Sequence, residues 1–196
     1  MSTLVIVCRA ISLLAFAGPM LLGVGARRGE RKSREPTTRT SQRGHRQTPV
    51  VANFAAFGLF FFSLVAFSDS ADGFTALVLA ALGVLLSIGG AALVLRSRAE
   101  LGSAWSLVPN AGQETGLVTT GPYRVIRHPI YLGLSLLAMG EAVAFGSWPA
   151  LAIVLCGIVP TFAWRSRAEE RLLSGTFDER YEVYRQRTKM IIPHLL

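Results

Sequence analysis

The chain has 196 residues, of which 51% are hydrophobic, with a mean hydropathy of +0.43 and a formal net charge of +8. This length allows one ordinary domain, but the composition excludes a typical soluble protein and favours an all-α integral membrane protein. The basic residues are not interleaved with the stacking aromatic residues that bind nucleic acid, so nucleic acid is not an expected partner. Cys8 and Cys156 lie far apart in apolar stretches and indicate neither a disulfide framework nor a metal site.

Five stretches are long and apolar enough to cross a bilayer, which needs roughly 20 helical residues and about 17 at the least. They are residues 3–24, 49–68, 74–95, 129–147 and 148–164. The last two are joined by a tight turn at residues 146–149. The first stretch lacks a basic leader region, so we expect a membrane span there and not a cleavable signal. We therefore predict a single membrane domain, residues 1–196, with five transmembrane helices.

Lysine and arginine are concentrated in three segments between and after these spans. Eight lie in residues 27–46, four in 96–127 and seven in 165–189, which leaves only Arg9. Five crossings place the three segments on one side, and the positive-inside rule identifies that side as the cytoplasm. The N-terminus is then outside and the C-terminus inside. Residues 25–48 are expected to form a cytoplasmic basic loop that orients the protein and contacts anionic lipid.

The stretch RVIRHPIYLG (124–133) lies at the start of the fourth predicted span. Pro129 suits the first position of a helix, because it has no amide hydrogen to leave unpaired. The free amides of that helix would point toward Arg127 and His128, which favours binding of a carboxylate or a phosphate. An interfacial cap, in which these residues and Tyr131 anchor to lipid headgroups, explains the pattern equally well. Local physics leaves both interpretations open.

The segment after the fifth span is expected to extend that helix, break at Ser174 and Gly175, and continue as a second helix to about residue 187. Arg165 and Glu169 have the spacing of a local ion pair on the first part. Three aromatic residues are expected to share one face of the tail, namely Phe177, Tyr181 and Tyr184. This face would pack the tail over the membrane.

Two charged residues lie inside predicted spans. Glu141 is twelve residues beyond Pro129, or about 18 Å along the helix. An ionisable group at that depth is a functional candidate by default. Arg9 lies six residues inside the first span, so both belong to the outer half of the bilayer. We expect either that the two residues pair or that Glu141 is protonated.

Four blocks of the sequence, in this order, resemble the isoprenylcysteine carboxyl methyltransferases and their prokaryotic relatives, integral-membrane enzymes that use S-adenosylmethionine. The blocks are LGSAWS (101–106), LVTTGPYRVIRHPIYLG (117–133), RSRAEE (165–170) and FDERYEVYRQRT (177–188), followed by Pro193. The resemblance covers roughly residues 101–194, and the first three spans match only in length and hydrophobicity. The family usually has glycine after the phenylalanine of the last block, where this chain has Asp178.

The resemblance implies that S-adenosylmethionine binds at the cytoplasmic ends of the fourth and fifth spans. A linker (96–128) and a C-terminal helical lid (165–196) would form the cofactor pocket, without a metal ion. The residues implied to act on the substrate are Arg127, Arg165 and Glu170. Those implied to bind the methionine part are His128 and Tyr131 at its carboxylate, and Glu169 or Glu170 at its amino group. Those implied to enclose the adenosine are Leu117, Val118, Thr119, Tyr123 and Tyr181.

The resemblance implies methyl transfer to a lipophilic acceptor, a small molecule or a prenylated substrate, within the membrane. A carboxylate acceptor is the favoured variant, and a thiol or an amine are the others. The composition, rich in Ala, Gly and Arg, favours a bacterial or archaeal cytoplasmic membrane. Two alternatives stay open. One is an NADPH-dependent membrane reductase of the steroid-reductase type, which has a similar HPxY segment, and the other is a non-enzymatic protein that handles lipid or haem. The oligomeric state is also open.

Overall fold

The structure is a computed structural model that describes residues 3–30, 43–68, 73–102 and 116–191, and for residues 19–30 and 43–50 the backbone alone. Much of the predicted basic loop, residues 103–115 of the linker and residues 192–196 of the tail lie outside the described residues. The block LGSAWS is described only for its first two residues, and Pro193 not at all.

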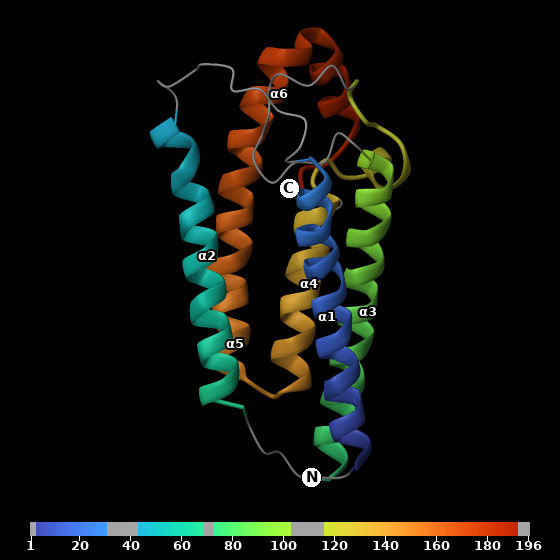
Figure 1. Ribbon diagram of the computed structural model, residues 1–196, viewed down its shortest axis with the longest axis vertical. Coiled ribbons are helices and arrows are strands. Elements are labelled where there is room, and N and C mark those ends of the chain that lie inside the picture. The colour runs from blue at the N-terminus through green and yellow to red at the C-terminus, as the bar shows by residue number, and fades with distance from the viewer. Residues whose placement is uncertain (1–2, 31–42, 69–72, 103–115, 192–196) are drawn as a thin grey trace.

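The described chain is almost entirely helical, and it contains no strand beyond one isolated bridge between Ile126 and Lys189. The helices run along the long axis of the molecule, except for the end of α6, which turns back at one end (Figure 1). They are α1 (Thr3–Glu30), α2 (Arg43–Ala66), α3 (Phe74–Leu101), α4 (Pro129–Ala144), α5 (Trp148–Ile153) and α6 (Val159–Arg187). A 3-10 turn, η2 (Gly121–Arg124), precedes α4, and a π-helical segment, η3 (Val154–Ile158), joins α5 to α6.

Each predicted span overlaps these helices, but α1, α2, α3 and α6 extend beyond the predicted bounds, so that both ends of the predicted basic loop, residues 25–30 and 43–48, are helical. Two helices of the described chain are long and apolar enough to cross a membrane, α3 and the continuous run of residues 148–187. Three shorter apolar helical stretches lie at Thr3–Gly18, Val51–Ala66 and Pro129–Ala144. Large apolar side chains point outward, with Val65 83% and Phe54 75% exposed. Such a surface suits lipid better than water, so the molecule is a helical membrane protein.

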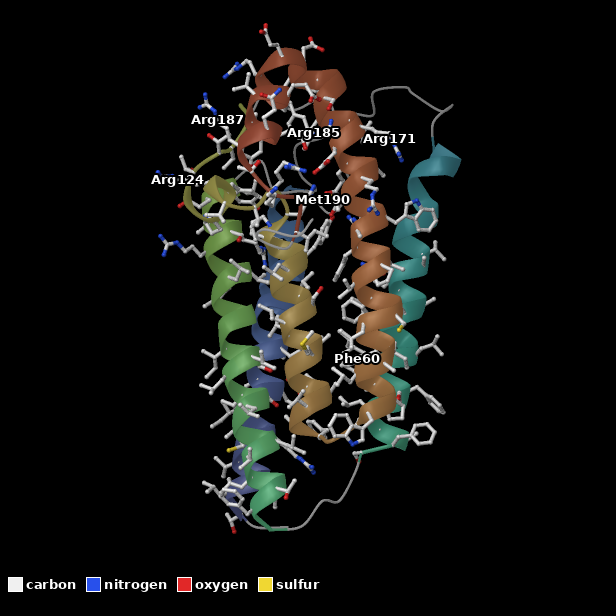
Figure 2. The ribbon with its side chains drawn as sticks, turned by 180° about the vertical axis from the view of Figure 1, so that it is seen from behind. Phe60, Arg124, Arg171, Arg185, Arg187 and Met190 are labelled. Atoms are coloured by element: carbon white, nitrogen blue, oxygen red, sulfur yellow. The ribbon has the colours of Figure 1, made fainter. Side chains whose placement is uncertain are left out.

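The ends of the molecule differ in composition. Arg124, Arg171, Arg185 and Arg187 all lie near one end, whereas Phe60 lies among the helices far from it (Figure 2). The same end holds the C-terminal end of α3, the N-terminus of α4 and the C-terminal part of α6 (Figure 1). We call it the basic end. The predicted clustering of positive charge on one side of the membrane agrees with this arrangement.

The helices pack as two groups, α1 with α3 and α4, and α2 with α5, η3 and α6. Within the first group, α3 and α4 approach so closely that their backbones touch. The glycines at this contact, which we call the α3–α4 seam, are Gly83 and Gly90 of α3 and Gly133 and Gly140 of α4. A Cβ atom added at any of them would come within 2.7 Å of an atom of the other helix. Small residues permit such close packing in membranes, and here they fix α4 against α3.

The predicted turn between the fourth and fifth spans is present. Helix α4 ends at Ala144, and Gly146 adopts a φ of 64°, a conformation that a side chain would strain. Ser147 caps α5 by accepting a hydrogen bond from the Ala150 amide at 3.4 Å. The chain therefore reverses within three residues, and α6 returns to the basic end beside the start of α4.

The predicted break at Ser174 and Gly175 is wrong, because both residues are helical. The interruption falls at Asp178, with φ 43° and ψ −125°, the one non-glycine residue with positive φ among those described. A single glycine inside a helix lowers its stability by only about 1 kcal/mol, so Gly175 need not end α6. The reversal requires a positive φ, and the chain adopts it at the position where the resembling family has glycine.

Glu141 is fully buried between three helices. Its carboxylate accepts hydrogen bonds from Ser12 of α1 at 3.1 Å and Ser87 of α3 at 3.5 Å. Arg9 donates instead to the Ala144 carbonyl at 2.9 Å. The ion pairs formed among the described residues do not include Arg9 with Glu141, so the predicted pairing is wrong. Ser12, one turn further along α1, reaches the carboxylate in its place. A protonated Glu141 stays a prediction.

Candidate active site

The approach to α4 is paired with the end of the tail through the backbone. The amide of Arg127 donates to the Lys189 carbonyl at 2.8 Å, and that of His128 donates to the Met190 carbonyl at 2.9 Å. The Lys189 amide donates in turn to the Val125 carbonyl at 3.1 Å. Two segments about sixty residues apart in sequence therefore lie side by side. This pairing brings the tail to the N-terminus of α4, as the predicted lid requires.

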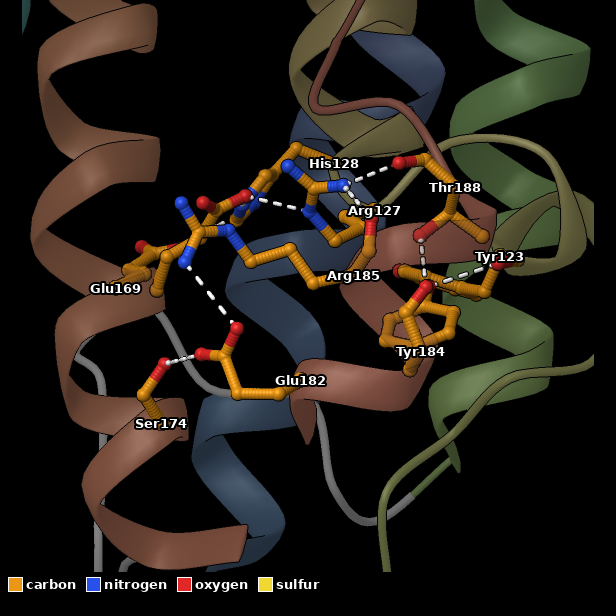
Figure 3. A network of polar contacts seen from close by, with 10 residues as sticks. Tyr123, Arg127, His128, Glu169, Ser174, Glu182, Tyr184, Arg185 and Thr188 are labelled. Carbon is orange, nitrogen blue, oxygen red and sulfur yellow. Dashed lines mark hydrogen bonds and ion pairs between the residues drawn. The ribbon is translucent and has the colours of Figure 1, made fainter. Parts of the chain in front are cut away.

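The side chain of Arg127 strengthens this attachment (Figure 3). Its Nε donates to Oε1 of Glu170 at 2.7 Å, and its Nη1 donates to the carbonyls of Arg185, at 3.1 Å, and Thr188. Burial alone would raise the pKa of Glu170, but its contacts with His128 and Arg127 outweigh burial and lower the pKa to about 2. Glu170 is therefore ionised at neutral pH. Arg127 connects α4 to both parts of α6, before and after the kink.

The carboxylate of Glu169 contacts three side chains. Its Oε1 accepts hydrogen bonds from the Tyr131 hydroxyl at 2.5 Å and from Arg165 Nε at 3.1 Å. Its Oε2 lies 3.6 Å from Nδ1 of His128. The pairing of Arg165 with Glu169, predicted from their spacing, is confirmed. These contacts join α4 to α6 across the interior of the basic end.

The ring of Tyr131 lies in an aromatic stack that leads from this polar region into the apolar interior. It stacks on His128 with centroids 5.6 Å apart, and on Phe162 of α6 with centroids 4.8 Å apart. The Arg165 guanidinium lies over the same ring at 5.6 Å. Phe162 then contacts Phe57 of α2 at 6.1 Å. The stack orients the Tyr131 hydroxyl toward Glu169.

Six of the predicted site residues therefore come together. We call them the active-site cluster: Arg127, His128, Tyr131, Arg165, Glu169 and Glu170. Its ion-paired side chains are at most 19% exposed, and two arginines balance two glutamates. A buried cluster with separated positive and negative groups is complementary to a ligand that is itself a zwitterion.

Three tyrosines lie beside the active-site cluster. The Tyr184 hydroxyl donates to the Tyr123 carbonyl at 2.7 Å, which connects the tail to η2 (Figure 3). Burial raises the pKa of Tyr123 and Tyr181 well above their usual value, and that of Tyr184 to about 12. All three therefore stay protonated at neutral pH. Tyr181, predicted to line the cofactor site, is 1% exposed, and Tyr184 is half-buried, in agreement with their predicted packing role. Phe177, predicted to share their helical face, lies before the kink at Asp178, so the three residues do not belong to one regular helix.

The predicted segment Leu117, Val118 and Thr119 has no regular secondary structure and leads into η2. It is tied to α3, because the next residue, Thr120, donates to Oε2 of Glu100 at 2.7 Å. Two residues near the cluster were not singled out from the sequence. Thr188 ends the last block, and Ser166 lies one turn before Glu170, a spacing that could have indicated it.

Known proteins match this chain over the same elements. A family model described as phospholipid methyltransferase matches residues 78–180, more than half of the chain. The nickel-cobalt-cadmium resistance protein NccN of Alcaligenes xylosoxydans xylosoxydans is 34% identical over 117 residues, 57% of this chain and 51% of that protein. The cobalt-zinc-cadmium resistance protein CzcN of Cupriavidus metallidurans is 37% identical over 105 residues, 50% of this chain and 46% of that protein.

A third relative is the protein-S-isoprenylcysteine O-methyltransferase of Schizosaccharomyces pombe, which is 32% identical over 77 residues, 39% of this chain and 33% of that protein. The chain thus spans about half the length, or less, of the curated relatives it matches. A solved structure of a eukaryotic intramembrane Ras methyltransferase, isoprenylcysteine carboxyl methyltransferase, superposes with a TM-score of 0.56. That match has 22% identity and covers 78% of this chain and 54% of that one, so it shows a shared fold.

The family model begins within α3 and ends in α6 beyond the kink, so it includes the whole active-site cluster. The sequence blocks, the helical membrane fold and the relatives point to the same group of proteins. The chain belongs to the phospholipid methyltransferase family.

Proposed function

We propose that this membrane methyltransferase uses S-adenosylmethionine and methylates a lipophilic acceptor, with the active-site cluster as its active site. A carboxylate is the favoured acceptor group, and a thiol or an amine are the other variants. One observation carries the proposal. The start of α4 meets α6 through paired charges, Arg127 with Glu170 and Arg165 with Glu169, at the basic end of an apolar bundle.

The residues present fit the amino-acid end of the cofactor. That end carries an ammonium and a carboxylate, and the active-site cluster offers paired charges of both signs. Nε2 of His128 is buried without a hydrogen-bond partner, as expected for an atom that serves a ligand. His128 and Tyr131 would bind the carboxylate, and Glu169 or Glu170 the ammonium. The adenosine would lie near Leu117, Val118, Thr119, Tyr123 and Tyr181.

The bound cofactor supplies an activated methyl group on a sulfonium, so the protein needs no nucleophilic residue of its own. The residues of the chain have to align donor and acceptor and exclude water. Burial of the active-site cluster favours both tasks. Arg165 lies one turn nearer the apolar part of α6 than Glu169, so it is the cation better placed toward an acceptor that enters from the bilayer. Arg127 mainly attaches the tail.

The proposed topology has five spans, with the N-terminus outside and the basic end in the cytoplasm. The linker and the tail form a lid, for which the backbone pairing of residues 125–128 with 189–190 is the support. The cofactor would enter from the cytoplasm. The acceptor, a lipophilic small molecule or a prenylated substrate, would enter laterally from a bacterial or archaeal cytoplasmic membrane. Membrane lipids surround the bundle.

Titration calorimetry with S-adenosylhomocysteine tests the proposal. The wild-type protein is expected to bind it, and His128→Ala and Glu170→Ala are expected to weaken binding about tenfold or more. Glu182→Ala is the control. The Glu182 side chain is 46% exposed, and its contacts are with Arg185 and Ser174 of the same helix. Unchanged affinity in both site variants would remove the site assignment. Thermal stabilisation by NADPH but not by S-adenosylhomocysteine would favour the reductase, and stabilisation by neither would favour a non-enzymatic role.

A further inference from the structure

Four buried side-chain atoms of the described residues have no hydrogen-bond partner. They are Ser63 Oγ, His128 Nε2, Ser166 Oγ and the Tyr181 hydroxyl. Leaving such an atom unpaired costs about 1–3 kcal/mol, so each one calls for an explanation. Ser63 lies on α2 beside the α4–α5 turn, at the end of the molecule opposite the basic end. The other three border the active-site cluster.

Glu170 is the common neighbour of these three residues. Ser166 lies four residues before it on α6, so the two side chains project from the same face of the helix. His128 Nε2 lies 3.4 Å from Oε1 of Glu170. The charge of Glu170 acts, after burial, to raise the pKa of Tyr181, so the phenol is within electrostatic reach of this carboxylate. The three unpaired atoms come from the residue before α4 and from the two parts of α6.

The atoms around Glu170 favour binding of a cation that carries several hydrogen-bond donors. Glu170 is an anion, and both hydroxyl oxygens can accept hydrogen bonds. His128 presents Nδ1 to Glu169 and Nε2 to Glu170, so the ring faces a carboxylate on each side. A second anion beside Glu170 would be repelled. A primary ammonium carries three N–H donors and no acceptor, and it matches an anion surrounded by unpaired acceptors.

We propose that Ser166 and Tyr181 complete a subsite around Glu170 that binds the ammonium group of the cofactor's amino-acid end. This inference rests on the proposed function. It adds Ser166 to the site, and it places the Tyr181 hydroxyl at the amino-acid end of the cofactor and not at the adenosine.

Two ligands and two variants test the subsite by titration calorimetry. S-adenosylhomocysteine carries the amino-acid end, whereas 5′-methylthioadenosine keeps the nucleoside and thioether without it. Ser166→Ala and Tyr181→Phe are each expected to bind S-adenosylhomocysteine about tenfold more weakly than the wild type, because each loses a hydrogen bond to a charged group. Their affinity for 5′-methylthioadenosine is expected to stay unchanged.

Thermal unfolding of the ligand-free protein separates binding from structure. Each variant removes a hydroxyl that has no partner, so the midpoint temperature is expected to stay the same or rise. Ser63→Ala is the matched control, because it removes an equally unpaired hydroxyl at the opposite end. It is expected to leave the affinity for S-adenosylhomocysteine unchanged.

Several results would overturn the subsite. If the wild type binds S-adenosylhomocysteine and both variants bind it equally well, the inference fails while the proposed function stands. Equal weakening for both ligands would place the hydroxyls at the adenosine. A lower midpoint temperature in both variants would assign them a structural role. A wild type that binds neither ligand would overturn the proposed function and this inference with it.

Discussion

The α3–α4 seam and the α4–α6 junction join the same helix to its neighbours in different ways. At the seam, glycines such as Gly90 and Gly133 let backbone touch backbone, and no side chain can be added without moving a helix. At the junction, long side chains such as Arg127 and Tyr131 reach across to carboxylates on α6. The seam gives the active-site cluster one rigid wall. The junction is made of individual polar contacts with which a ligand can compete.

The largest effect is expected from filling the seam. Gly90→Ala places a Cβ 2.7 Å from the Gly133 carbonyl oxygen and 2.9 Å from the Leu137 amide nitrogen. Because both are backbone atoms, the helices must separate, and we expect a loss of about 3 kcal/mol in the free energy of unfolding. Thermal unfolding in detergent measures it. Gly89→Ala, at the adjacent position with no neighbour within 4 Å, is expected to stabilise slightly through helix propensity. Equal effects of the two substitutions would contradict the seam.

Breaking the junction is expected to have a similar or slightly smaller effect. Arg127→Met removes the partner of a buried carboxylate and two contacts to tail carbonyls. Breaking a buried ion pair from one side costs about 3 kcal/mol, and the tail is expected to become sensitive to protease. Limited proteolysis with mass spectrometry measures the release. Arg185→Ala is the control. The main-chain carbonyl of residue 185, which accepts a hydrogen bond from Arg127, remains, and only the half-exposed ion pair with Glu182 is lost. The tail should therefore stay protected from the protease.

The ionisation of Glu170 gives the junction a pH dependence that the seam lacks. The folded-state pKa of about 2 lies below the ordinary value of 4.5. Glu170 therefore contributes stability at pH values above about 4.5, and this contribution, on the order of 2 kcal/mol, is lost as the pH falls toward 2. Denaturation followed between pH 6 and pH 3 is expected to show it. Glu170→Gln should flatten this part of the profile, and an unchanged slope would contradict the assignment.

The smallest effect is expected at the kink in the tail. Asp178 holds φ at 43° and ψ at −125°, a region that glycine occupies without strain. Asp178→Gly is expected to raise the free energy of unfolding by about 1 kcal/mol without changing the fold. Asp178→Ala keeps a Cβ and should bring no such gain. Thermal unfolding of the two variants in parallel decides between them.

The sequence predicted the parts of the fold that depend on apolar length and on local spacing. Each apolar stretch overlaps a helix, Gly146 makes the expected turn, and Arg165 pairs with Glu169 one turn away. Six of the predicted site residues converge because they flank a tight hairpin whose ends must meet. This much follows from hydropathy and connectivity.

Other features depend on interactions that leave no local pattern. The pairing of Val125 with Lys189 uses backbone atoms, and neither side chain indicates it. The break at Asp178 was placed at Gly175, because propensity favours glycine while tertiary docking determines where the chain must turn. Ser12 replaced Arg9 as the partner of Glu141: both side chains face α4, but they differ by one turn in height along α1, so Arg9 meets the Ala144 carbonyl and Ser12 the carboxylate.

The backbone pairing between residues 125–128 and 189–190 has a consequence for how this surface can evolve. Main-chain bonds make no demand on side-chain identity, and Val125 is 57% exposed. Mutations that accumulate on this outer edge therefore leave the tail attached. The protein can change the chemistry of this exposed edge while the buried active-site cluster keeps its arrangement.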